Sequence, residues 1–420
     1  MKLAVIGAGS TYTPELVEGF ASRPGAYELA LHDIDADRLD VVGGLAKRIL
    51  SRAGYAGAAT LTTSLPQALD GASAVLVQLR VGGQQTRLRD ETIPARYGLV
   101  GQETTGAGGF AKALRTVPVV LDIAAQAQRL AAPDAWIVDF TNPVGIVTRA
   151  LLDAGHRAVG LCNVAIGFQR RFAARFGVAA EDVELDHLGL NHLTWIRGVR
   201  VAGVEQLPAI LESDYASELA EEIGAPIELM RTLGAIPSYY LHYFYCTDEV
   251  VEAQRHGPHR AEEVQAIEAT LLELYRDESL DTKPALLEQR GGAYYSEAAA
   301  ALVTSLLTGD GARHYVNLRN DGTIAGLADD AVVEVPAVVD RDGPHAVELA
   351  GLPHELLGLV QEVTQYEELT IEAALSGDRS VAARALVANP LVRQWDSVPE
   401  LLDELLRAHA QYLPRFASRR

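Results

Sequence analysis

Two groups of residues in this 420-residue sequence carry side chains that could do chemistry. A thiol and an amide stand together at Cys162 and Asn163, and an imidazole follows about thirty residues later at His192. If the fold brings Cys162 and His192 together, they could form a nucleophile pair or ligate a metal, or the cysteine could be inert packing. A segment dense in phenols, residues 236–245, contains Tyr240. A tyrosine there could act as a general base if a nearby cation lowers its pKa, or it could be a core aromatic.

A glycine-rich turn follows the first apolar run, residues 3–6, and precedes a helix that starts near Pro14. Two glycines with this spacing permit a tight turn and a close approach of a pyrophosphate to a helix N-terminus, although Tyr12 replaces the third glycine of the dinucleotide fingerprint. An acid at the end of the second apolar run can accept hydrogen bonds from the adenosine ribose, which favours NAD over NADP. The predicted cofactor-binding residues are Gly7, Gly9, Ser10, Thr11 and Asp33.

Three further polar residues could contact a substrate. Asn142 follows the apolar run 136–140, where it could bind a hydroxyl or the nicotinamide, or cap the next helix. Arg87 and Arg260 stand in polar surroundings that are typical of loops, where arginines are often only solvated surface charges.

Positioning these residues requires a sheet whose strands end where they stand. Strand-length apolar runs without polar alternation indicate strands covered on both faces, and they alternate with amphipathic stretches at 37–50 and 112–130. The runs are 3–6, 28–32, 74–79, 136–140 and 158–162. This alternation predicts an α/β fold, namely a Rossmann-type doubly wound parallel sheet of the lactate-dehydrogenase type, with functional residues at the carboxyl ends of the strands.

The rest of the chain has a different pattern. Residues 80–109 are polar and rich in glycine, which predicts a long functional loop. Beyond residue 170, expected strands at 182–190, 194–201, 314–319 and 332–339 are mixed with expected helices at 221–233, 260–276, 296–307, 354–374 and 398–413. We therefore expect an NAD-binding domain over residues 1–170 and a mixed α+β domain for catalysis and oligomerisation over residues 171–420.

Composition narrows the class of protein. Apolar residues make up 48% and charged residues 22%, as in ordinary globular proteins, and the formal net charge of −20 disfavours nucleic acid and anionic membranes as partners. Two cysteines cannot form a disulfide framework, and no apolar stretch approaches the ~18 residues of a membrane span. A cytoplasmic enzyme with a small-molecule substrate is expected.

Several short strings, taken in order, resemble glycoside hydrolase family 4, and in particular its NAD- and divalent-metal-dependent 6-phospho-β-glucosidases. The resemblance covers nearly the whole chain, and the absence of the third glycine is itself typical of this family. The strings are Ile6-Gly7-Ala8-Gly9-Ser10-Thr11-Tyr12-Thr13-Pro14-Glu15, Gly101-Gln102-Glu103-Thr104-Thr105-Gly106, Phe140-Thr141-Asn142-Pro143, Gly160-Leu161-Cys162-Asn163-Val164, Gly189-Leu190-Asn191-His192, Tyr240-Leu241-His242-Tyr243, Arg290-Gly291-Gly292 and Asn320-Asp321-Gly322-Thr323-Ile324.

The resemblance implies hydrolysis by redox-assisted elimination, an exception to the two-carboxylate scheme of most glycosidases. Bound NAD⁺ would oxidise the C3 hydroxyl of the sugar, and a base would remove the acidified C2 proton. The leaving group at C1 would then depart, water would add, and NADH would reduce C3 again. The substrate would be a phosphorylated disaccharide or β-glucoside, and the enzyme a homodimer or homotetramer.

Matched residue by residue, the resemblance also assigns roles. Cys162 and His192 would hold a divalent metal, Mn²⁺ by family analogy although thiolate ligands favour softer ions. Tyr240 would remove the C2 proton, with Tyr239 and Tyr243 as alternatives. The substrate contacts would be Arg87, Asn142, Asn163 and Arg260, the arginines being suited to a sugar phosphate.

Two departures from the family pattern concern the substrate. Asn163 stands where relatives acting on α-glycosides often carry an acid, which leaves the general acid unassigned. Ala165 replaces a proline common in β-type relatives, and Tyr239 stands where an aspartate is frequent. Alternatives are therefore a relative acting on an α-linked or unphosphorylated glycoside, a 2-hydroxyacid dehydrogenase of the lactate/malate type, and a non-catalytic NAD-sensing module.

Overall fold

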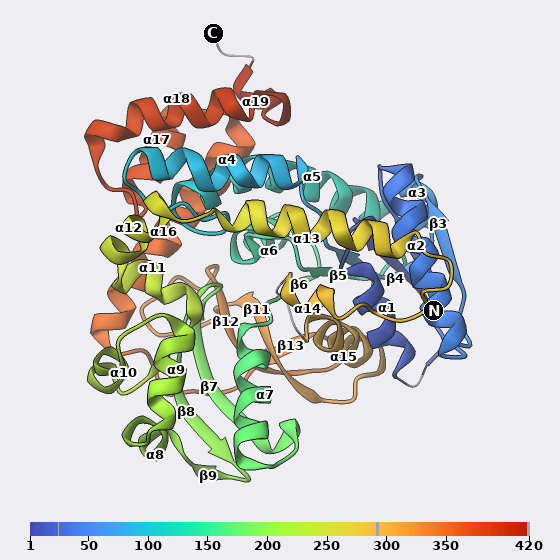
Figure 1. Cartoon of the computed structure of the whole chain (residues 1–420), viewed down its shortest axis with the longest axis horizontal. Helices are drawn as coiled ribbons and strands as arrows, with labels where there is room; N and C mark the ends of the chain where they lie inside the picture. Colours follow the sequence, from blue (N-terminus) through green and yellow to red (C-terminus); the bar gives the residue numbers. More distant parts are fainter. Residues whose placement is uncertain (24, 291–293, 418–420) are drawn as a thin grey trace.

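The computed structural model describes residues 1–23, 25–290 and 294–417, and the strands of these residues form one mixed sheet of 13 strands (Figure 1). Six of them are parallel and lie in the order β3-β2-β1-β4-β5-β6. They are β1 (Lys2–Ile6), β2 (Glu28–His32), β3 (Ala59–Thr62), β4 (Ala72–Val77), β5 (Trp136–Asp139) and β6 (Ala158–Leu161). The order reverses between β1 and β4, which is the crevice where Rossmann-type sheets place ligands. The predicted Rossmann-type sheet is confirmed.

Burial explains which of these strands the sequence reveals. Five of the six residues of β4 are buried, because helices cover both faces of the sheet at this point. β3 lies at the sheet's edge, and only Thr62 of its four residues is buried. An edge strand with polar residues lacks the continuous apolar run of a covered strand, which is why residues 59–62 escaped prediction.

Antiparallel strands extend the sheet beyond β6. They are β7 (Val183–Leu190), β8 (Leu193–Val201), β9 (Val204–Glu205), β10 (Ile236–Pro237), β11 (Ala312–Arg319), β12 (Val332–Val339) and β13 (Pro344–Ala346). β11 pairs with β6 through Val316 opposite Leu161 and Asn317 opposite Gly160, so the sheet is continuous between the two halves of the chain. The mixed C-terminal part is confirmed, whereas the division at residue 170 stays a prediction.

Helices pack on both faces of the sheet. α4, α5 and α13 lie side by side along the upper side of Figure 1, while α7 to α10 surround β7 and β8 at the lower left. The helices are α1 (Thr13–Ala21), α2 (Ala36–Arg52), α3 (Leu65–Leu69), α4 (Gly83–Arg96), α5 (Gly106–Leu130), α6 (Val144–Asp153), α7 (Val164–Phe176), α8 (Leu207–Glu212), α9 (Tyr215–Ile223), α10 (Ile227–Leu233), α11 (His242–Tyr245), α12 (Thr247–His256), α13 (Arg260–Tyr275), α14 (Leu286–Gln289), α15 (Tyr295–Thr308), α16 (His354–Ser376), α17 (Arg379–Ala388), α18 (Val398–Ala408) and α19 (Pro414–Ala417).

The expected long loop over residues 80–109 is wrong. Helix α4 occupies 14 residues of this segment, and α5 begins at Gly106, before the segment ends. The helix escaped prediction because four of the six residues it buries are polar: Gln84, Thr86, Asp90 and Glu91 are all less than a tenth exposed. Without an apolar stripe, the helical period that sequence reasoning depends on is absent.

Two other expected helices end differently. The helix expected at 221–233 is two helices, α9 and α10, separated at Gly224, whose φ of +72° is a left-handed conformation that ends a helix. The helix expected at 398–413 ends at Ala408 as α18, and a short 3₁₀ turn follows it.

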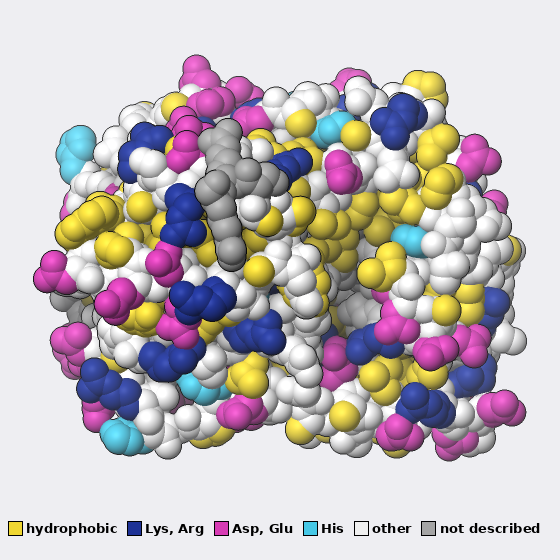
Figure 2. All heavy atoms as spheres, turned by 90° about the horizontal axis from the view of Figure 1, so that it is seen from above, with side chains coloured by type: hydrophobic (Ala, Val, Ile, Leu, Met, Phe, Trp, Pro, Cys, Tyr) yellow, Lys and Arg dark blue, Asp and Glu magenta, His cyan; other side chains and the backbone are white. Residues whose placement is uncertain are grey.

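No helix among the described residues is long and apolar enough to cross a membrane. On the face seen in Figure 2, acidic and basic side chains are interspersed with apolar ones. The acidic excess of the chain is therefore mixed with positive charges on this face.

Candidate active site

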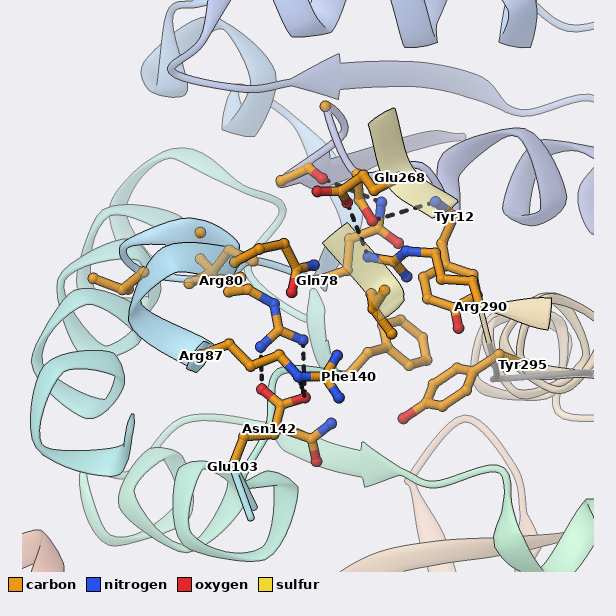
Figure 3. A pocket seen from close by; sticks show the side chains of 18 of the residues that line it. Tyr12, Gln78, Arg80, Arg87, Glu103, Phe140, Asn142, Glu268, Arg290 and Tyr295 are labelled. Atoms are coloured by element: carbon orange, nitrogen blue, oxygen red, sulfur yellow. Dashed lines mark hydrogen bonds and ion pairs between the residues drawn. The ribbon is translucent and has the colours of Figure 1, made fainter. Parts of the chain in front are cut away.

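A cavity of about 2120 Å³ opens along the carboxyl ends of the parallel strands. Its lining includes the glycine-rich turn after β1 and Asp33 after β2, and it continues past Asn142 and Asn163 to Tyr240. Figure 3 shows the middle of this cavity, where side chains from α4, from the loops after β4 and β5, and from α13 point toward one another. The residues predicted from widely separated motifs are thus gathered at one edge of the sheet.

The turn after β1 is built for close approach. Gly7 has a φ of +92°, and a Cβ on it would lie 2.8 Å from the carbonyl oxygen of Gln78. At Gly9, a Cβ would lie 2.8 Å from Asp33 Oδ2, which accepts a hydrogen bond from the Gly9 amide at 2.8 Å. Ser10 also lines the cavity, whereas Thr11 is fully buried and lies outside the lining. Of the five residues predicted to hold the dinucleotide, four face the cavity.

Tyr12, in the place of the third glycine, contacts residues that the sequence reasoning missed. The guanidinium carbon of Arg290 lies 4.1 Å from the centre of the Tyr12 ring. Glu268 on α13 holds Arg290 at 3.2 Å and Arg38 at 3.3 Å, and all three line the cavity. Arg290 begins a string of the family pattern whose glycines, 291 and 292, lie outside the described residues. An aromatic ring and two cations therefore border the turn where a pyrophosphate would lie.

Cys162 and His192 lie behind the cavity wall rather than in its lining. Burial raises the pKa of the Cys162 thiol and lowers the pKa of His192 to about 4, so both are neutral in the protein alone. His192 has a left-handed φ of +63°, and its Nδ1 is buried without a hydrogen-bond partner, as is Oδ1 of Asn142. Among the described residues, no group of three or more His, Cys, Asp or Glu side chains could hold a metal.

Glu334 on β12 binds several side chains near Cys162 and His192. Its oxygens accept hydrogen bonds from His187 Nε2 at 2.8 Å, Asn191 Nδ2 at 2.8 Å and Asn317 Nδ2 at 3.2 Å. Burial raises the pKa of this carboxyl, but the bonds from His187 and Asn191 outweigh it and hold the pKa below its usual value. A single carboxylate in the apolar run 332–339 was the sequence signal that could have revealed it.

Tyr240 lies against the imidazole of His192. The two ring centres are 3.7 Å apart and the ring planes differ by 18°, so the rings are stacked. Burial raises the pKa of Tyr240, and the nearby Cys162 raises it further. Of the alternatives, Tyr239 stacks on Phe168 with ring centres 4.8 Å apart, and burial raises the pKa of Tyr243 to about 12. All three tyrosines line the cavity, and Tyr240 is the one in contact with a predicted metal ligand.

Arg87 belongs to a buried cluster of charges. Glu103 is bound by Arg80, by Lys112 at 2.7 Å and by Arg87 at 3.2 Å. Burial favours the neutral form of Glu103, but the three cations hold its pKa well below the usual value. Burial, and then Arg80, lower the pKa of Lys112 to about 7. Figure 3 shows Arg80 facing Glu103 and the side chain of Arg87 extending toward Asn142.

Arg260 occupies the first turn of α13 at the edge of the cavity. Its side chain is 46% exposed and binds Glu263 at 2.7 Å and the carbonyl oxygen of Gln289 at 2.8 Å. The residue lines the same cavity as Arg87, Asn142 and Asn163, so all four predicted substrate contacts share one space.

Comparison with known proteins assigns the chain to a family. A model of family 4 glycosyl hydrolases matches residues 2–178, and a model of that family's C-terminal domain matches residues 187–392. A probable 6-phospho-beta-glucosidase of Bacillus subtilis is 42% identical over 434 residues, covering 99% of this chain and 98% of that protein. The 6-phospho-beta-glucosidase of Escherichia coli is 35% identical and covers 99% and 97%.

Solved structures agree with these matches. The 6-phospho-beta glucosidase of Thermotoga maritima, with NAD and glucose-6-phosphate, superimposes with a TM-score of 0.92 at 36% identity over 98% of this chain and 99% of that one. A second structure of that enzyme, with manganese, NAD⁺ and glucose-6-phosphate, has the same TM-score at 35% identity and covers the same shares of both chains. The fold and cavity define a Rossmann-type enzyme. The chain belongs to family 4 of the glycosyl hydrolases.

Proposed function

We propose that this chain is a 6-phospho-β-glucosidase that works by redox-assisted elimination with bound NAD⁺ and a divalent cation. The observation that carries the proposal is the contact of Tyr240 with His192 in a cavity that starts at the glycine turn and Asp33. Redox-assisted elimination requires a base next to a cation site, and a dinucleotide site in the same cavity. The β configuration rests on the relatives, which are named 6-phospho-beta-glucosidases.

The residues present fit both groups. Gly7 and Gly9 leave space that a Cβ would fill, as expected where a pyrophosphate approaches the backbone. Cys162 and His192 would hold the cation. The Nδ1 atom of His192 is buried and has no hydrogen-bond partner in the protein, so it is available to bind one. A cation would favour the thiolate of Cys162 and so oppose the rise in its pKa that burial causes, and the lowered pKa of His192 keeps its imidazole neutral, the form that binds a cation. Mn²⁺ is proposed because a relative's structure contains manganese.

When bound, NAD⁺ supplies reversible oxidation at C3 of the sugar, and the cation supplies Lewis-acid polarisation of the neighbouring oxygens. Tyr240 takes the C2 proton in this proposal, and the loss of that proton lets the C1 substituent leave. Asn142 offers an amide donor and acceptor to a sugar hydroxyl, and Arg87 and Arg260 bind the phosphate. Asn163 has no acidic proton, so it orients the substrate and does not protonate the leaving group.

The proposal also concerns the cellular compartment and the oligomeric state of the enzyme. A phosphorylated sugar substrate and a soluble dinucleotide are cytoplasmic compounds, and both free cysteines, Cys162 and Cys246, are compatible with a reducing compartment. We propose that the enzyme acts there as a homodimer or homotetramer, which sedimentation would test.

The test uses p-nitrophenyl 6-phospho-β-D-glucoside with NAD⁺ and Mn²⁺, since p-nitrophenolate leaves without needing a general acid. We expect release of p-nitrophenol that stops when the cation is chelated, with the α anomer and the unphosphorylated glucoside as comparisons. In D₂O the released sugar phosphate should carry deuterium at C2, without net accumulation of NADH. Product without C2 deuterium refutes the elimination, and release from the α anomer alone refutes the β assignment.

A further inference from the structure

Glu91 connects the two arginines proposed to bind the phosphate. It lies on α4 one turn after Arg87, and only 3% of it is exposed. Its Oε1 accepts a hydrogen bond from Arg87 Nε at 2.8 Å, and its Oε2 accepts one from the backbone amide of Ala261 at 2.8 Å. Ala261 follows Arg260 in the first turn of α13. One buried carboxylate therefore binds Arg87 directly and the backbone beside Arg260.

The two arginines come from segments that only packing brings together. They are separated by more than 170 positions in the sequence, and their helices, α4 and α13, lie side by side (Figure 1). Both arginines line the cavity. The Arg260 side chain binds Glu263 and Gln289, so Glu91 holds the start of its helix and not its guanidinium. Glu91 therefore joins the two helices close to both arginines, in addition to the direct packing of α4 on α13.

The bond from Arg87 to Glu91 also orients the guanidinium. It uses Nε, the nitrogen nearest the backbone, and Glu103 approaches the same atom at 3.2 Å. The two terminal nitrogens extend into the cavity, where Figure 3 shows the side chain reaching toward Asn142. A guanidinium fixed at Nε presents its terminal nitrogens as a fork, the geometry that binds two oxygens of a phosphate.

We propose that Glu91 is a positioning residue that sets the spacing and orientation of Arg87 and Arg260 for the phosphate of the substrate. The inference rests on the proposed function for the identity of that phosphate. It assigns Glu91 no contact with the substrate. The proposal explains why Arg87 has two buried carboxylates beside it. Glu103 alone would balance the charge of Arg87, but only Glu91 also binds α13.

The test is Glu91→Gln, which keeps the size of the side chain but can offer an acceptor to only one of the two donors. We expect the dissociation constant for glucose 6-phosphate, measured by calorimetry, to rise about tenfold, or ~1.4 kcal/mol. The KM for the phosphorylated glucoside should rise by a similar factor, with kcat within about threefold of wild type. Binding of NAD⁺ at the other end of the cavity should be unchanged.

Glu404→Gln is the matched control. Glu404 binds Arg96 and Tyr97 at the far end of α4, so this variant weakens the same helix without touching either phosphate-binding arginine. Its dissociation constant for glucose 6-phosphate should stay within twofold of wild type. Should Glu91→Gln not fold, Glu91→Asp, which is too short to reach both donors, is measured instead.

An unchanged dissociation constant in the Glu91 variant overturns the inference, as does an equal loss of NAD⁺ and glucose 6-phosphate binding, which would mark a merely structural role. If the wild type binds glucose 6-phosphate but cleaves no phosphoglucoside, the proposed function is refuted. The role of Glu91 is then decided by the dissociation constants of the variants. A wild type that binds no glucose 6-phosphate refutes both.

Discussion

Replacing Tyr240 with phenylalanine separates a catalytic role from a packing role. The change removes one oxygen and keeps the ring, and the ring makes the 3.7 Å stack on His192. We therefore expect the free energy of unfolding to change by no more than about 1 kcal/mol, the usual net value of one hydrogen bond. Loss of a general base lowers turnover by about 10²–10⁴-fold. That range corresponds to ~2.7–5.4 kcal/mol in the activation barrier.

The assay compares kcat for the p-nitrophenyl substrate with urea unfolding of the same preparations. Tyr243→Phe is the control, because Tyr243 lines the same cavity 6.2 Å from the Tyr240 ring. Exchange of C2 hydrogen with solvent should disappear in the Tyr240 variant and persist in the Tyr243 variant. A Tyr240→Phe protein that is less stable but turns over normally would refute the reasoning and make Tyr240 a core aromatic.

Three further predictions concern single residues. Cys162→Ser should abolish Mn²⁺ binding in calorimetry and cation-dependent turnover while NAD⁺ binding persists; near-normal turnover would make the ligand assignment wrong. Asp33 should make the enzyme prefer NAD⁺ to NADP⁺ because it would face a 2′-phosphate, and equal KM values for the two would contradict this. Burial lowers the pKa of His314 to about 4, so its contribution to stability is complete above pH 6.5 and is lost as the pH falls toward 4. Between pH 7.5 and 5 the free energy of unfolding of wild type should fall ~2 kcal/mol more than that of His314→Asn in urea titrations; an equal fall in both would contradict it.

The elements that could be predicted from the sequence are those that bury apolar side chains. The parallel strands other than β3 were predicted because both of their faces are covered, and the glycine turn was predicted because only residues without a side chain permit its close contacts. α4 was taken for a loop because it buries polar side chains such as Asp90, which binds Arg115 with neither side chain exposed. Periodicity detects apolar faces, and ion pairs inside the protein leave no such period.

Some residues of the candidate site could be predicted from the sequence, and others could not. Cys162, His192 and Tyr240 were predicted from residue type, position in the sequence and family resemblance, and their roles stay predictions. Glu334 escaped because its three hydrogen-bond partners lie on other strands and loops, up to 147 positions away. Glu91 escaped because its role depends on a helix 170 positions away. Partners so distant in the sequence are set by packing, which no local pattern encodes.

The pairing of β11 with β6 has a consequence for how molecules enter and leave the cavity. Many two-part enzymes exchange ligands by a hinge motion in which two bodies rotate apart. Here the backbone hydrogen bonds at Leu161 and Gly160 join both halves into one sheet directly beneath Cys162, so such a rotation would have to break them. Ligand exchange that leaves these bonds intact keeps the two halves of the chain joined, so the floor of the cavity stays the same whether the site is empty or filled.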